Sequence, residues 1–148
     1  MSEQQDLFCA RRNTNRNEVH YAIRTEGETA KPLGHAPVIG YWQMLEKGPD
    51  VTEPILLIEQ VAFGIGHQCT EGDQIYVKLA ALPDREIRIA RDADDPKKYR
   101  AFIQIDGAEA ELTGFYAHAE PGFLLPKVKY LDIQGLRAGV QVSERILK

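Results

Sequence analysis

The fold class is decided by one stretch of the sequence, YRAFIQIDGAEAEL at residues 99–112. It places Asp106-Gly107 between two runs in which apolar and polar residues alternate, and this is the strongest short-range signal for a β-hairpin. A two-residue type I′ turn needs a positive φ at both central positions, and Asp and Gly tolerate that conformation. The stretch therefore predicts two antiparallel strands joined by a tight turn.

The turn also sets the register of the predicted hairpin. The facing pairs are Ile105 with Ala108, Ile103 with Ala110 and Ala101 with Leu112 on an apolar face, and Gln104 with Glu109 and Phe102 with Glu111 on a mostly polar face. Because side chains alternate with a period of two, a shift by one residue would turn the apolar set toward water. The hairpin therefore indicates an antiparallel sheet with one solvated face.

The size and composition of the chain are those of a single globular domain spanning residues 1–148. Hydrophobic residues make up 43% and charged residues 27%, both ordinary values. The net charge of -4 argues against a general nucleic-acid binder, which would show a basic face. No run approaches the roughly 18 apolar residues of a membrane helix. We therefore expect neither a nucleic-acid nor a membrane partner.

Residues 1–6 show neither the basic nor the apolar segment of a secretory signal, which predicts a cytoplasmic protein unless a leader was removed. Cys9 and Cys69 lie on separate segments without the spacing of a metal motif. In a reducing compartment we expect both to be core or half-exposed thiols, with a disulfide as the minor alternative.

Short alternating segments recur along the whole chain and are separated by turn residues. Such spacing is typical of an all-β barrel or sandwich. Strands are expected in the ranges 7–10, 19–23, 38–45, 61–65, 75–81, 87–89, 99–105, 108–116, 128–133 and 140–146.

One helix is predicted at residues 52–60. Thr52 is a good N-cap, and Glu53 and Pro54 suit the first helical turn, although β-branched residues weaken the helix propensity of the segment. The complete prediction is an all-β, mainly antiparallel β-barrel of the lipocalin or calycin type, or a flattened β-sandwich, with this one short helix.

Two segments, RRNTNRNEVHY at 11–21 and PVIGYW at 37–42, carry a resemblance to a known family. They resemble the opening of an uncharacterised bacterial family that is catalogued only as a domain of unknown function. The similarity covers nearly the whole chain and continues through residues 58–59, 62–65, 105–107, 126–130 and 144–146. The family brings no known activity, so the resemblance implies no catalytic residue. Some relatives carry an exported leader that this chain lacks, which bears on the compartment.

The segment Gly40-Tyr41-Trp42 also resembles the Gly-x-Trp motif of lipocalin-like barrels. In those barrels a late basic residue packs over the tryptophan, and the resemblance implies Arg145 for that place. This likeness concerns the fold and not the function.

The sequence shows no strong catalytic or cofactor motif. It lacks Gly-x-Gly-x-x-Gly before a helix, a Walker loop, His-Glu-x-x-His and Cys-x-x-Cys. His20, His35, His67 and His118 lie on separate segments, so a shared metal site would depend on the fold bringing them together. We therefore assign no catalytic residue, no cofactor and no metal site.

The polar segment at residues 11–17 is the main candidate for a binding site. Arg12 and Arg16 are suited to hold a carboxylate or phosphate through their planar guanidinium groups, with Asn15 and Asn17 as neutral donors and Tyr21 beside them. The alternative is an Asn-rich turn with solvated arginines. That alternative is favoured, because turn chemistry alone accounts for asparagine there.

Trp42 and Glu59 complete the set of candidate ligand-binding residues. Trp42, with Tyr41 and Phe63, either lines a pocket or belongs to the core, and burial statistics favour the core. Glu59 lies on the predicted helix. It is either a buried acid with a raised pKa or, more commonly, a solvated or ion-paired side chain.

Three functions are compatible with these observations. The favoured one is a non-catalytic protein that binds a small molecule, such as an anion, or a protein partner. The second is an enzyme that acts on a small anionic substrate held by the loop at 11–17. The third is a structural or assembly module that pairs through an edge strand, as in a homodimer.

Overall fold

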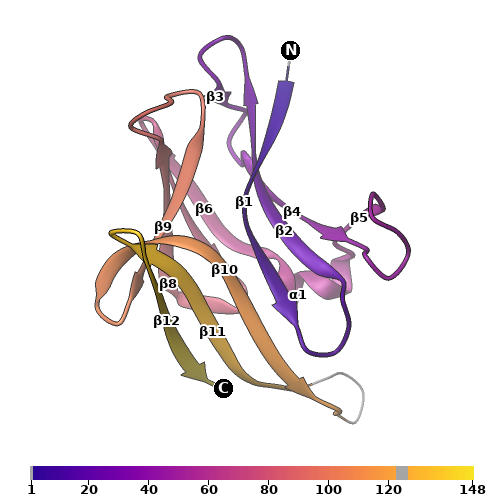
Figure 1. Ribbon diagram of the computed structural model, residues 1–148. Helices are drawn as coiled ribbons and strands as arrows, with labels where there is room; N and C mark the ends of the chain where they lie inside the picture. The colour runs from indigo at the N-terminus through magenta and orange to yellow at the C-terminus, as the bar shows by residue number, and fades with distance from the viewer. Residues whose placement is uncertain (1, 123–126) are drawn as a thin grey trace.

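The computed structural model describes residues 2–122 and 127–148, and most of them lie in β-strands (Figure 1). The all-β, mainly antiparallel prediction is thereby confirmed. The strands are β1 (Ser2–Arg12), β2 (Glu18–Glu26), β3 (Lys31–Pro32), β4 (Val38–Gln43), β5 (Thr52–Pro54), β6 (Ile65–Glu71), β7 (Gln74–Leu79), β8 (Leu82–Arg91), β9 (Tyr99–Ile105), β10 (Ala108–Glu120), β11 (Lys127–Arg137) and β12 (Val140–Leu147).

The strands form one twelve-stranded sheet. Its path runs β5-β4-β2-β1-β10-β9-β8-β7-β6, with β11 and β12 added beside β10, and β3 beside β2. Among the described residues the pairings are antiparallel except for that of β1 with β10. In Figure 1, β1, β2, β4 and β5 lie at the right of the view, and β10 to β12 cross its lower part.

The sheet is not closed into a barrel, which corrects the lipocalin-like barrel of the sequence prediction. Near the two ends of the path, a side chain joins β6 to β4. The amide of Gln68 accepts a hydrogen bond from the Val38 N–H (3.1 Å) and donates one to the Val38 carbonyl (2.9 Å). Because a side-chain amide stands where a barrel would have a backbone ladder, the two ends approach without becoming one continuous sheet. The flattened sandwich stays a prediction.

β10 lies between two halves of the sheet, one that runs from β1 to β5 and one that runs from β9 to β6. It connects them because its partners change along its length. Residues 108–111 pair with β9, and residues 114–117 pair in parallel with β1. Gly114, where the second pairing begins, lies opposite Cys9, and a Cβ atom there would come within 2.8 Å of the Cys9 carbonyl oxygen. Glycine is therefore the residue that permits this close approach of β10 to β1.

The inward faces of both halves share one hydrophobic core. Its members are mainly β-branched and aromatic side chains, which suit a half-buried pleated surface. They include Phe8, Val19, Tyr21 and Ile23 from β1 and β2, and Ile75, Val77, Ile87, Ile89, Ile103 and Ile105 from β7, β8 and β9. The sheet thus has an inner face on this core and an opposite face, called the outer face below.

The Asp-Gly hairpin forms as predicted. Asp106 has φ 52° and Gly107 has φ 83°, and the two strands pair in the expected register from Ile105–Ala108 to Phe102–Glu111. The register ends there because β10 leaves β9 for β1, so the predicted Ala101–Leu112 pair is not part of the ladder. Ala108 is exposed, and the other apolar side chains of this face are buried.

The helical segment begins later and is shorter than the sequence predicts. Thr52 lies in β5, opposite Gln43 of β4, and is not an N-cap. The helical residues are the 3₁₀ helix η1 (Leu57–Glu59) and the helix α1 (Gln60–Phe63), so β6 starts at Ile65 and not at residue 61. The pairing of β5 with β4 outweighs the local capping signal, because tertiary context overrides weak propensity.

None of the described helices is long and apolar enough to cross a membrane.

Replacing Gly107 by valine is expected to destabilise the protein by roughly 1–3 kcal/mol, because a β-branched residue resists the positive φ of this turn. Urea denaturation measures the change. Ala108→Val is the matched control, since it adds the same side chain at the neighbouring strand position. Equal stability of Gly107→Val and wild type would contradict the strain argument.

Glu144 ties β12 to the tip of the same hairpin. It accepts two hydrogen bonds from Arg85 (2.7 and 3.0 Å) and one from the Asp106 N–H (2.7 Å). The hydrogen bonds from Arg85, followed by the one from the Asp106 backbone, lower the pKa of Glu144 below its ordinary value of 4.5. A lowered pKa means that this carboxylate stabilises the fold above its ordinary pKa, and that the stabilisation is lost as the pH falls through the lowered value.

Glu144→Gln is therefore expected to reduce stability at pH 7 and to make the decline in stability below about pH 4.5 shallower than in wild type. Denaturation curves at a series of pH values test this. Parallel curves for the two proteins across the acid range would show that the Arg85–Glu144 pair contributes no pH-dependent stability.

Candidate functional site

Three of the seven predicted binding residues, Arg12, Trp42 and Glu59, meet on the inner side of the sheet. The guanidinium carbon of Arg12 lies 4.8 Å from the centre of the Trp42 ring and 5.3 Å from that of Phe63. Trp42 Nε1 donates a hydrogen bond to Glu59 Oε1 (3.1 Å), which also accepts one from the Leu56 N–H (2.9 Å). Trp42 is buried, as the sequence analysis favoured.

The arginine over Trp42 is thus Arg12, which corrects the lipocalin-like expectation of Arg145. Arg145 instead lies over Tyr130 at 3.8 Å and forms two hydrogen bonds to Asp132. Burial lowers the pKa of Arg12, and the nearby Glu59 acts in the opposite direction. Arg12 Nε is buried without a hydrogen-bond partner in the described part of the chain. This cluster holds the end of β1, β4 and η1 together.

The other four predicted residues have structural partners. The Tyr21 hydroxyl is buried and donates to the Phe63 carbonyl (2.7 Å). Asn15 Oδ1 accepts from Arg12 Nη2 and from the Asn17 N–H, both at 3.0 Å, and Asn17 Oδ1 accepts from the Glu46 N–H (2.9 Å).

The Arg16 side chain is 73% exposed, and its Nε lies 3.8 Å from a Glu46 carboxylate oxygen. The hydrogen bonds that Asn15 and Asn17 accept through their side-chain oxygens are those of an Asn-rich turn. Arg12 and Arg16 therefore have separate partners, one aromatic and one acidic. Anion binding by this loop stays a prediction.

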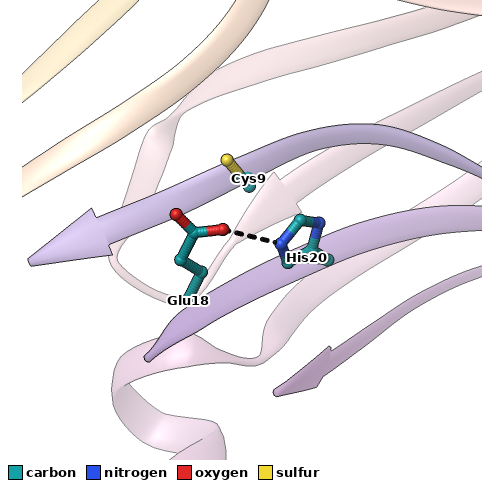
Figure 2. Close-up of side chains that lie close together, drawn as sticks. All are labelled: Cys9, Glu18 and His20. Atoms are coloured by element: carbon teal, nitrogen blue, oxygen red, sulfur yellow. Dashed lines mark hydrogen bonds and ion pairs between the residues drawn. The ribbon is translucent and has the colours of Figure 1, made fainter. Parts of the chain in front are cut away.

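A second cluster lies on the outer face, where Cys9 of β1 meets Glu18 and His20 of β2 (Figure 2). Their potential ligand atoms, one from each side chain, all lie within 4.8 Å of one another. His20 Nε2 is 3.0 Å from Glu18 Oε1. All three residues are partly buried, and the side chains of Glu18 and His20 are 22% and 20% exposed.

Strand alternation explains why these three side chains share a face. Val19 and Tyr21 point into the core, so Glu18 and His20 project from the opposite side of β2. Phe8 enters the core from β1, and Cys9 therefore projects outward, directly opposite His20 in the register. A shift in the β1–β2 register between Asp6 and Phe8 adjusts the phase of β1 before this point.

Two further residues surround His20. Tyr41 of β4 lies opposite His20, and the two rings stack with centres 5.6 Å apart and an interplanar angle of 22°. The Tyr41 hydroxyl donates to Asp6 Oδ1 (2.7 Å), and Asp6 Oδ2 lies 3.8 Å from His20 Nδ1. Burial, followed by the hydrogen bond to Asp6, raises the pKa of Tyr41.

Cys9 is a reduced thiol, as is Cys69. Burial raises the pKa of Cys9, and the negative charge of Glu18 raises it further, with Arg11 acting in the opposite direction. In the absence of a metal ion, Cys9 is therefore protonated at neutral pH and is a poor nucleophile. A thiol, a carboxylate and an imidazole at this spacing are suited to binding a metal ion.

No metal site was predicted at this cluster. In the sequence the histidines lie on separate segments and the cysteines lack the spacing of a metal motif. The one local signal was the alternation of His20 with Val19 and Tyr21 in the strand predicted at residues 19–23, which Glu18 directly precedes. Cys9 joins them only through the register of β1 with β2, which the sequence left open.

Two surface depressions lie away from both clusters. One of about 480 Å³ lies over β8 and β9, but its Arg85 and Arg88 already pair with Glu144 and Glu109. The other, of about 490 Å³, includes Arg100, which pairs with Asp92 and Glu111. Arg85, Arg88 and Arg100 are therefore neutralised by carboxylates of the same chain, whereas Arg137, in the second depression, donates hydrogen bonds to backbone carbonyls.

These observations define an all-β domain with an open, mainly antiparallel sheet and a Cys-Glu-His cluster on its outer face. The chain belongs to the family described as Domain of unknown function (DUF4833), whose model matches residues 8–145. This match confirms the family resemblance inferred from the sequence. No curated protein and no solved structure matches the chain.

Arg12→Lys is expected to destabilise the protein by about 1 kcal/mol, because lysine loses the planar stacking on Trp42 and Phe63 while keeping the charge. The chain has one tryptophan, so the emission of Trp42 should also shift. Urea denaturation followed by fluorescence measures both effects. Arg11→Lys is the control, because Arg11 is the exposed neighbour of Arg12. Equal changes in stability and in emission for the two variants would contradict a specific role of Arg12.

Proposed function

We propose that the protein is a non-catalytic small-ligand-binding protein whose ligand is a divalent metal ion of the zinc class. The observation that carries this proposal is the gathering of three different ligand types, Cys9, Glu18 and His20, within 4.8 Å on one face of the sheet. Each is a common zinc ligand.

The spacing supports zinc. Zinc binds thiolate sulfur at about 2.3 Å and imidazole nitrogen or carboxylate oxygen at about 2.0–2.2 Å, so tetrahedral ligand atoms lie roughly 3.3–3.6 Å apart. His20 Nε2 and Glu18 Oε1 are 3.0 Å apart, and the largest separation in the cluster stays within 4.8 Å. Binding therefore needs side-chain adjustments of about 1 Å.

The donor set supports a transition metal over Mg²⁺ or Ca²⁺. Those two ions prefer oxygen ligands, whereas a thiolate with an imidazole suits zinc and its neighbours. A reducing compartment would keep Cys9 available as a ligand.

The ligand count supports reversible binding. Structural zinc sites have four protein ligands, whereas this cluster supplies three from the described residues, which leaves one position for water. Catalytic zinc sites share that count, so the enzyme hypothesis is retained as the second candidate. The two depressions described above lie elsewhere on the surface, so neither places a substrate beside the bound ion, and this favours binding over catalysis.

Isothermal titration of the chelator-treated, reduced protein with Zn²⁺ is expected to show one site per chain. Cys9→Ser and His20→Gln should each weaken binding by more than the roughly 10–100-fold typical of an outer-sphere change. Cys69→Ser and His118→Gln are the matched controls and should bind as wild type does. With Co²⁺ as the probe, a thiolate charge-transfer band should appear in wild type and be absent in Cys9→Ser.

Two results would overturn the proposal. The first is that wild type binds no more Zn²⁺ than the Cys9→Ser variant does. The other is Zn²⁺ binding that depends on Cys69 or His118 and not on Cys9 and His20.

A further inference from the structure

We infer that Asp6 and Tyr41 are positioning residues of this metal site and that together they hold the His20 ring with Nε2 toward the ion. The inference rests on the proposed function and adds to it an outer shell of ligand-orienting groups. Asp6, from β1, and Tyr41, from β4, approach His20 of β2 from both neighbouring strands.

The two imidazole nitrogens of His20 have different neighbours. Nε2 faces the cluster and lies 3.0 Å from Glu18 Oε1, whereas Nδ1 lies 3.8 Å from Asp6 Oδ2. A metal-ligating histidine almost always donates its other ring N–H to a carboxylate, a backbone carbonyl or water. Asp6 is the carboxylate next to Nδ1, and an approach of about 1 Å would bring it to hydrogen-bond distance.

Tyr41 gives Asp6 its orientation. The Asp6 side chain is 54% exposed, so its carboxylate would otherwise be free to turn into solvent. The Tyr41 hydroxyl donates to Oδ1 at 2.7 Å, and this bond leaves Oδ2 turned toward His20. A tyrosine and a carboxylate thus act as one unit on the imidazole.

Tyr41 also acts on the imidazole directly. Its ring stacks on that of His20 with a centre-to-centre distance of 5.6 Å. Stacking restricts rotation of the imidazole, because an edge-on ring would clash with or leave the tyrosine face. The stacking therefore fixes the plane of the ring, and the Asp6 carboxylate beside Nδ1 favours the flip that leaves Nε2 toward Glu18.

The test compares Asp6→Asn and Tyr41→Phe with wild type in the full chain, with Zn²⁺ as the probe. Asp6→Asn is expected to lower the Zn²⁺ affinity about 10–100-fold while one site per chain is kept. Tyr41→Phe should lower it in the same direction by a smaller factor, because the stacked ring remains.

The chain offers matched controls at a second stacked pair. His118 and Tyr130 stack with centres 4.9 Å apart, and the nearby Asp132 is held by Arg145. Tyr130→Phe and Asp132→Asn make the same chemical changes there and should leave the Zn²⁺ affinity unchanged.

A spectroscopic measurement separates positioning from a general structural effect. In the Zn²⁺-loaded wild type, ¹⁵N spectra of the His20 ring should show a proton on Nδ1 that exchanges slowly with water. Asp6→Asn should make that exchange faster, while the melting temperature of the metal-free variant stays at the wild-type value.

The outcomes distinguish this inference from the proposed function. If wild type binds no Zn²⁺ at Cys9 and His20, the proposed function and this inference are both overturned. If wild type binds there, and Asp6→Asn and Tyr41→Phe bind equally tightly with unchanged Nδ1–H exchange, only the positioning role is overturned. Should Asp6→Asn fail to fold, Tyr41→Phe, which removes a single hydroxyl, decides between the two results.

Discussion

The register of β1 against β2 is the constraint on which both residue clusters depend. It places Cys9 opposite His20 and Ala10 opposite Val19. A one-residue slip would exchange the two faces of β1, exposing Phe8 and burying Cys9 and Arg11. The core resists such a slip because Phe8 stacks on Tyr21 with ring centres 4.9 Å apart and also contacts Phe115 edge-on. The same aromatic packing that stabilises the core therefore also holds the outer cluster in place.

Neighbouring residues of one strand contribute to opposite faces of the sheet. In β4, Trp42 lies in the core beneath Arg12, whereas Tyr41 stacks on His20 on the outer face. The Gly-Tyr-Trp segment that resembles a lipocalin motif thus serves two clusters with different chemistry. On the inner side, a cation lies over aromatic rings and holds three segments together. On the outer side, polar side chains from three strands surround a single imidazole.

The family match places the three proposed ligands in the shared domain and leaves one of the positioning residues outside it. Cys9, Glu18 and His20 lie within residues 8–145, as does Tyr41, whereas Asp6 precedes the matched segment. Family membership by itself assigns no role to any of these residues. The three proposed ligands lie inside the family domain. The contribution of Asp6 is a proposal about this chain.

Features that depend only on neighbouring residues were predictable from the sequence. The positive φ angles at Asp106 and Gly107, the alternation in β2 and β9, and the all-β class all follow from local backbone preference and a period of two. Helix placement was wrong at Thr52 because a strand pairing outweighed the capping preference.

Tertiary structure alone decided whether the sheet closes, which arginine covers Trp42 and which ligands meet at His20. Each of these depends on contacts between residues far apart in the chain. Gln68 reaches Val38, Arg12 reaches Trp42, and Cys9 reaches His20. Such contacts depend on strand register and on the packing of the whole core, which no single segment of the sequence specifies.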